Sequence, residues 1–107
     1  MDYKDLYASL TKKLEQEIPI TAYPIRELVQ IFREKGNLIT LKSKLTITSV
    51  FNSGDISGII CTVGENTENV FSCSLTHLVF DKKFSLYKEI ADYQQKRNKR
   101  IKQLNQM

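Results

Sequence analysis

The sequence predicts a small α+β domain, and three observations support this. Apolar residues recur every three or four positions near both ends of the chain, which indicates amphipathic helices. Between these segments the period changes to two, which is typical of half-buried strands. The chain has 107 residues, 41% hydrophobic and 26% charged, so we expect residues 1–107 to form one domain around one core. The predicted architecture is two N-terminal helices, a three-stranded antiparallel meander and a C-terminal helix, with the helices on one face of the sheet.

Two helices are expected before residue 37. Asp2 can cap the first, and Pro19 disfavours helical geometry in the residue before it and so ends that helix. The second has Pro24 in its first turn, where a missing N–H costs nothing, and ends at Gly36, which can adopt the left-handed conformation. The apolar faces that we expect them to bury are Tyr3, Tyr7 or alternatively Leu6, Leu10 and Leu14 in the first helix, and Ile25, Leu28, Val29 and Phe32 in the second.

The first strand is predicted from the alternation of apolar residues with Thr and Lys between Ile39 and Thr48. Fifteen extended residues from Asn37 would span roughly 50 Å, which is too long for a domain of this size. We therefore expect this strand to be bent or split near Ser43.

Two turns set the expected register of the meander. The run Asn52–Gly54 suits a three-residue hairpin loop with Gly54 in the left-handed region. That loop would place Ile47 opposite Ile59 and Leu45 opposite Cys61.

A second turn over residues 65–69 would place Cys61 opposite Cys73, Val63 opposite Phe71 and Ile59 opposite Leu75. The two registers agree on one apolar face, since a shift of one residue would divide the set between the two faces. We expect that face to bury Ile39, Leu41, Leu45, Ile47, Ile59, Cys61, Val63, Phe71, Cys73 and Leu75.

The opposite face of the sheet is expected to carry mostly Ser and Thr, as a solvated antiparallel sheet does. Four apolar residues interrupt it, and we interpret them as candidates for self-association: Val50, Ile60, Leu78 and Phe80. A three-stranded sheet also leaves edges that a second copy could pair or shield.

The basic charge of the chain is concentrated at its C-terminal end. Residues 81–107 hold eight basic and three acidic side chains. The last helix is expected from Ser85 to Leu104, with residues 94–107 as a projecting basic end. The candidates for contact with nucleic acid are Lys96, Arg97, Lys99, Arg100 and Lys102. The alternative is a solvated helix end, because cations interact favourably with a helix C-terminus.

No motif for catalysis or for cofactor binding is present. The soft metal ligands are Cys61, Cys73 and His77, and a strand places Cys73 and His77 about 13 Å apart, too far for one metal. We interpret His77 as a structural histidine, with a general base of a small enzyme as the alternative. We interpret the cysteines as reduced, buried thiols, with a cross-strand disulfide as the alternative. No enzyme activity, metal, cofactor or small-molecule substrate is therefore expected.

The sequence thus favours a small non-enzymatic interaction module, a homo-oligomer that self-associates through its sheet. The alternative is a nucleic-acid-binding accessory protein that uses the basic C-terminal helix. We expect a cytoplasmic protein without a membrane partner, because no apolar run approaches the ~20 residues that span a bilayer and the N-terminus has no apolar signal core.

Overall fold

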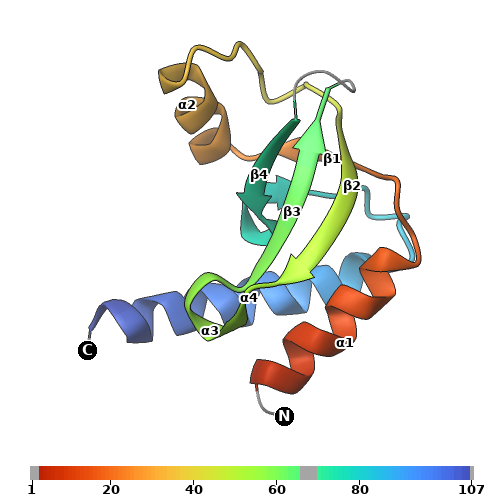
Figure 1. The fold of residues 1–107 in the computed structure, drawn as a ribbon, viewed down its shortest axis with the longest axis vertical. Helices are drawn as coiled ribbons and strands as arrows, with labels where there is room; N and C mark the ends of the chain where they lie inside the picture. The colour runs from red at the N-terminus through yellow and green to blue at the C-terminus, as the bar shows by residue number, and fades with distance from the viewer. Residues whose placement is uncertain (1–2, 66–69, 107) are drawn as a thin grey trace.

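A computed structural model describes residues 3–65 and 70–106 of the chain (Figure 1). It confirms an α+β fold with an antiparallel sheet and a C-terminal helix, but the sheet has five strands rather than three. The strand order across the sheet is β4-β3-β2-β1-β5. The elements in chain order are α1 (Tyr3–Glu15), β1 (Ile20–Pro24), α2 (Arg26–Glu34), β2 (Leu45–Asn52), α3 (Gly54–Ser57), β3 (Ile59–Gly64), β4 (Val70–Ser74), the short 3₁₀ helix η1 (Leu75–His77), β5 (Leu78–Val79) and α4 (Tyr87–Asn105).

Helices α1 and α4 cover the end of the sheet where β2 ends and β3 begins (Figure 1). α1 buries Tyr7, Leu10 and Leu14 of the predicted stripe. From α4, the ring of Tyr93 meets that of Tyr7 edge to face, with centroids 5.3 Å apart. α2 lies at the opposite end of the sheet (Figure 1), where Phe32 packs on Phe71 with ring centroids 4.6 Å apart.

The segment before the second helix is a strand, which the sequence analysis did not predict. β1 alternates buried Ile20, Ala22 and Pro24 with more exposed residues, and it pairs with β2 on one side and β5 on the other. Pro24 is thus the last residue of a strand and not part of a helical turn, and α2 begins at Arg26. A five-residue strand bounded by prolines gives too short an alternation to stand out from a helix boundary.

The predicted first strand is correct only from Leu45 onward. The residues before it form an irregular segment, in which Thr40 N–H donates to Ser43 Oγ and Ser43 N–H donates to the Thr40 carbonyl. Such local hydrogen bonds offer the backbone an alternative to a sheet ladder. Ile39 is buried, whereas Leu41 is half exposed and does not belong to the core.

The predicted register of the first hairpin is wrong. Gly54 has the expected positive φ of 84°, but it begins the one-turn helix α3 instead of closing a tight turn. β3 therefore starts later, and Ile47 faces Val63 rather than Ile59. A register shift between Ile47 and Ser49 marks a β-bulge, after which Val50 faces Cys61. Because a bulge inserts one residue, it exchanges the faces that the following residues occupy.

The predicted register of the second hairpin is confirmed, since Cys61 faces Cys73 and Val63 faces Phe71. Residues 66–69 of the predicted turn lie outside the described residues. Leu75 is buried as expected, but in η1 rather than opposite Ile59. Apart from Leu41 and the half-buried Phe71, all residues predicted for the inner face are buried.

Candidate interaction surface

The structure buries three of the four residues that were predicted to mediate self-association. Val50, Leu78 and Phe80 are 6%, 1% and 5% exposed and belong to the core. The bulge turns Val50 inward, and the unpredicted strand β5 places Leu78 against Pro24. Only Ile60 lies on the outer face of the sheet, where it is half-buried.

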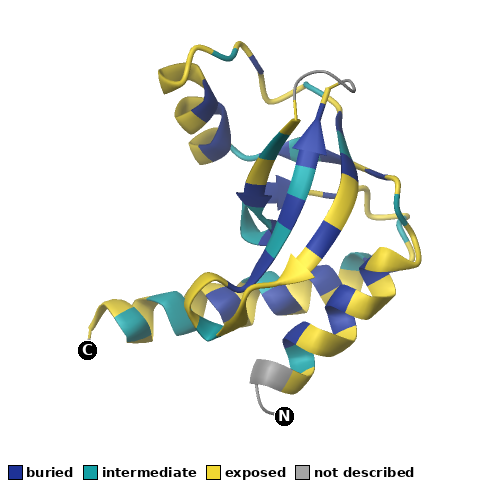
Figure 2. Cartoon of the chain, viewed as in Figure 1, coloured by how far each residue is buried: buried dark blue, intermediate teal, exposed yellow. Residues whose placement is uncertain are grey.

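The outer face of β2, β3 and β4 carries Phe51 next to Ile60. These residues are directly opposed, and Phe51 is 48% exposed. Beside them, Ser49 Oγ donates to Thr62 Oγ1 at 2.8 Å, which places both side chains on the same face. The alternation along β3 of buried residues with half-buried ones is visible in Figure 2. We call the following set the outer face: Thr46, Ser49, Phe51, Ile60, Thr62, Val70, Ser72 and Ser74.

None of the five strands described contains an Asp, Glu, Lys, Arg or His residue. The chain as a whole is 26% charged, so the charges lie on the helices and connections. Natural sheets usually protect an exposed edge with a lysine, a proline or a bulge. β4, at one margin of this sheet, has none of these along Val70–Ser74, and the other margin is the two-residue strand β5.

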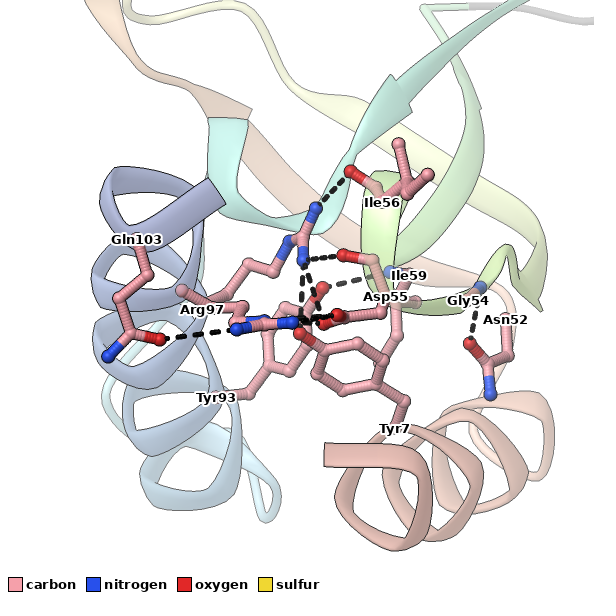
Figure 3. Close-up of polar contacts among 10 residues, drawn as sticks. Tyr7, Asn52, Gly54, Asp55, Ile56, Ile59, Tyr93, Arg97 and Gln103 are labelled. Carbon is pink, nitrogen blue, oxygen red and sulfur yellow. Dashed lines mark hydrogen bonds and ion pairs between the residues drawn. The ribbon is translucent and has the colours of Figure 1, made fainter. Parts of the chain in front are cut away.

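The structure places Arg97 of the predicted basic surface inside the protein. Its side chain is 2% exposed, and its guanidinium donates to the backbone carbonyls of Asp55 and Ile56 and to Tyr7 Oη (Figure 3). A buried guanidinium needs such partners, because its desolvation is costly. Arg97 is therefore a structural residue that attaches α4 to α3, and it is not presented to solvent.

The other basic residues of α4 differ in their partners. Arg100 forms a bidentate ion pair with Asp55, in which Arg100 Nε lies 3.0 Å from each carboxylate oxygen. This hydrogen bond is the main reason why the pKa of Asp55 lies below its usual value. Lys96 pairs with Asp92 at 3.0 Å on the helix surface. Lys99 and Lys102 are exposed, so the candidate nucleic-acid surface presents fewer cations than its sequence suggests.

Gly58 explains how α3 can approach α4 so closely. Its φ is 70°, and a β-carbon at this position would lie 2.6 Å from Tyr93 Oη and 2.8 Å from Arg97 Nε. Tyr93 Oη accepts a hydrogen bond from Ile59 N–H at 2.8 Å (Figure 3). The connection between β2 and β3 is thus held by two side chains of α4, and this fixes where β3 begins.

The cysteines and the histidine do not form a chemical site in the described part of the chain. Cys61 and Cys73 are directly opposed, buried and not bonded to each other. Burial raises the pKa of Cys73 to about 12 and raises that of Cys61 further, so both thiols are protonated and unreactive at neutral pH. The backbone carbonyl of His77 accepts a hydrogen bond from Ile25 N–H. No cluster of three His, Cys, Asp or Glu residues that could hold a metal occurs among residues 3–65 and 70–106.

Two residues of these surfaces were not predicted from the sequence: Phe51, which the bulge turns outward, and Asp55, which pairs with Arg100. The alternation in β2 gave no sign of the bulge. A signal for Asp55 did exist, since a lone acid in a turn and a run of lysines and arginines without acids can form ion pairs with each other.

Comparison with protein families finds no family model that matches the chain. Comparisons with curated proteins and with solved structures find no significant match. Within the part of the chain that the structure describes, no helix has the length and apolar character needed to cross a membrane.

Proposed function

We propose that this protein is a small non-enzymatic interaction module that self-associates through the outer face of β2, β3 and β4. The observation that carries the proposal is the lack of charge on the strands, together with the exposed pair of Phe51 and Ile60. We infer a cytoplasmic location as part of the same proposal, because opposed thiols that pack as apolar groups suit a reducing compartment.

The lack of charge favours a second copy of the chain as the partner. In a dimer with two-fold symmetry the same patch meets itself, so a charged residue near the axis meets its own copy. Because the residues of the outer face are uncharged, two copies can pack their outer faces together without placing like charges next to each other. Ser and Thr hydroxyls can donate and accept hydrogen bonds, so they pair with their own copies without a change of sequence.

The edge strand β4 extends the same surface. Val70, at its start, is 48% exposed, and Ser72 is also exposed. Because β4 has no residue that discourages pairing with another strand, a second copy that covers the outer face also shields this edge.

The test is the oligomeric state of two variants by sedimentation equilibrium. Phe51→Lys and Ile60→Lys each place a cation on the outer face, and two such cations would meet across the dimer. Both variants should be folded monomers under conditions in which the natural chain is a dimer. The matched control is Leu38→Lys, which adds the same charge at a residue that is 88% exposed and lies outside the sheet.

The Leu38→Lys control should dimerise to the same extent as the natural chain. A monomeric natural chain at tens of micromolar, or outer-face variants that dimerise normally, would contradict the proposal. If the natural chain is a monomer, the outer face is a solvated sheet surface.

Contact with nucleic acid through α4 is the second candidate function. Lys99 and Lys102 favour it, because they are exposed and three residues apart, which places them on one side of the helix. Two phosphate contacts predict a log–log salt slope of about −2 with duplex DNA. Truncation of Arg97 is not a valid test of this function, because it removes a structural contact.

A further inference from the structure

A cleft lies between α2 and the irregular segment that follows it. α2 lies at the end of the sheet opposite α1 and α4 (Figure 1). The volume of the cleft is about 510 Å³, and it is open to solvent. The residues that line it from α2 are Arg26, Val29, Gln30, Arg33 and Glu34, and those from the segment are Thr40 and Leu41. None of the strands contributes, so the cleft is separate from the outer face.

Two arginines of this cleft have no acidic partner among residues 3–65 and 70–106. The ion pairs found among the described residues include neither Arg26 nor Arg33. The two are seven residues apart on one helix, which separates them by roughly 10 Å along its axis. Val29 lies between them on the same helix and is largely buried, at 8% exposed, while Leu41 lines the cleft from the facing segment. Along α2 the cleft therefore has a basic residue, then an apolar one, then a second basic residue.

The surroundings increase the positive charge. Residues 26–44 hold five basic and two acidic side chains, a net charge of +3. The N-cap residue Ile25 gives no side-chain hydrogen bond to the first amides of α2, so the partial positive charge of the helix N-terminus is not compensated by a cap. Glu34, in the last turn of α2, is the acidic residue among those that line the cleft.

Exposed apolar side chains extend beyond the cleft along the same segment. Leu41 is 50% exposed and Leu38 is 88% exposed. A phosphate polymer would make no use of this apolar surface, and a small anion would not reach both arginines. A peptide with two acidic side chains on either side of an apolar one satisfies all of these features at once.

We propose that this cleft binds an acidic peptide segment of a partner protein, in which two carboxylates about 10 Å apart flank apolar side chains. Arg26 and Arg33 each take one carboxylate through charge-assisted hydrogen bonds, which a guanidinium forms with good geometry. Leu41, which is half exposed, contacts the apolar side chains between them, and only the small exposed part of Val29 borders these side chains. This binding does not depend on self-association of the sheet.

The test is a titration of the isotope-labelled full chain followed by amide and guanidinium NMR signals. The probe is the acetylated and amidated peptide Gly-Ser-Glu-Leu-Leu-Glu-Ser-Gly, whose glutamates lie on the same side and about 9 Å apart in the polyproline II conformation. Saturable shifts are expected at residues 26–34 and 40–41. The control peptides replace both glutamates by glutamine or both leucines by serine, and each should bind more weakly.

The variant Arg26→Gln/Arg33→Gln should bind the probe roughly tenfold more weakly, since two surface charge pairs are lost. The matched control is Lys12→Gln/Lys88→Gln, which removes the same charge from two exposed residues of α1 and α4, and it should bind normally. The absence of shifts in the cleft, equal binding of the glutamine peptide, or an equal effect of the lysine variant would overturn the proposal. Tighter binding of a DNA oligonucleotide at the same residues would also overturn it, in favour of a phosphate ligand.

Discussion

Gly58 lies directly against Tyr93, so that a β-carbon at position 58 would come within 2.6 Å of the tyrosine hydroxyl. The same hydroxyl accepts a hydrogen bond from Ile59 N–H. The absence of a side chain at Gly58 therefore lets α4 hold the first residue of β3. This contact connects two segments that are more than thirty residues apart in the sequence.

Gly58→Ala should destabilise the protein by about 2–5 kcal/mol, because it combines a positive φ with a collision that must displace Tyr93 or Arg97. The control is Gly36→Ala. Gly36 also has a positive φ, of 85°, but nothing lies within 4 Å of the added carbon. Gly36→Ala should lower the free energy of unfolding by only about 1 kcal/mol. Urea unfolding followed by circular dichroism measures the stability of both variants. Equal losses of stability would show that the close approach of Gly58 to Tyr93 is unimportant.

Arg97→Met should cost about 3–5 kcal/mol, because it removes the guanidinium that donates hydrogen bonds to the carbonyls of Asp55 and Ile56 and to the hydroxyl of Tyr7. Lys99→Met, on the exposed side of the same helix, should change the free energy of unfolding by less than about 0.5 kcal/mol. If the two variants are equally stable, Arg97 does not attach α4 to α3.

The acid sensitivity of the fold should depend on Asp55. Its pKa is lowered mainly by the hydrogen bond from Arg100, so its carboxylate favours the folded state. That contribution is present above the pKa of the unfolded chain, about 3.9, and is lost as the pH falls through the lower pKa of the folded state. Asp55→Asn should therefore be less stable than the natural chain at pH 6. Its free energy of unfolding should also fall less than that of the natural chain when the pH is lowered. Parallel stability curves for the two proteins would contradict this.

Much of the fold could be predicted wherever the deciding interactions are local. The stripe of α1 follows from apolar spacing, and the register of β3 with β4 follows from a short turn, so Cys61 was correctly placed opposite Cys73. The start of β3 could not be predicted in this way. It is set by the hydrogen bond of Tyr93 with Ile59 and by the contact of Arg97 with α3, and nothing near Gly54 in the sequence shows these contacts.

The candidate site was less predictable than the fold, because it depends on single-residue shifts. The bulge after Ile47 exchanges Val50 and Phe51 between the two faces of the sheet. The basic C-terminal run could be read from composition, but the inward direction of Arg97 depends on acceptors about forty residues away.

The thiols of Cys61 and Cys73 should not react with a disulfide reagent at pH 8 in the folded protein, and both should react in urea. The raised pKa of each thiol stabilises the folded state below the pKa of the unfolded chain, about 8.5. Above that pH, the unfolded state loses protons that the folded state keeps, so stability should fall as the pH rises. A Cys61→Ser/Cys73→Ser variant should lack this alkaline decline. Rapid labelling of the folded chain would show that the inner face is accessible.

The solution mass of the natural chain tests the central claim most directly. Light scattering behind a sizing column, at tens of micromolar protein, should give twice the chain mass of 12.4 kDa. The dimer should persist when the salt concentration is raised, because an uncharged interface is not weakened by screening. A mass of 12.4 kDa at every concentration, or a dimer that dissociates in salt, would contradict self-association through the uncharged outer face of the sheet.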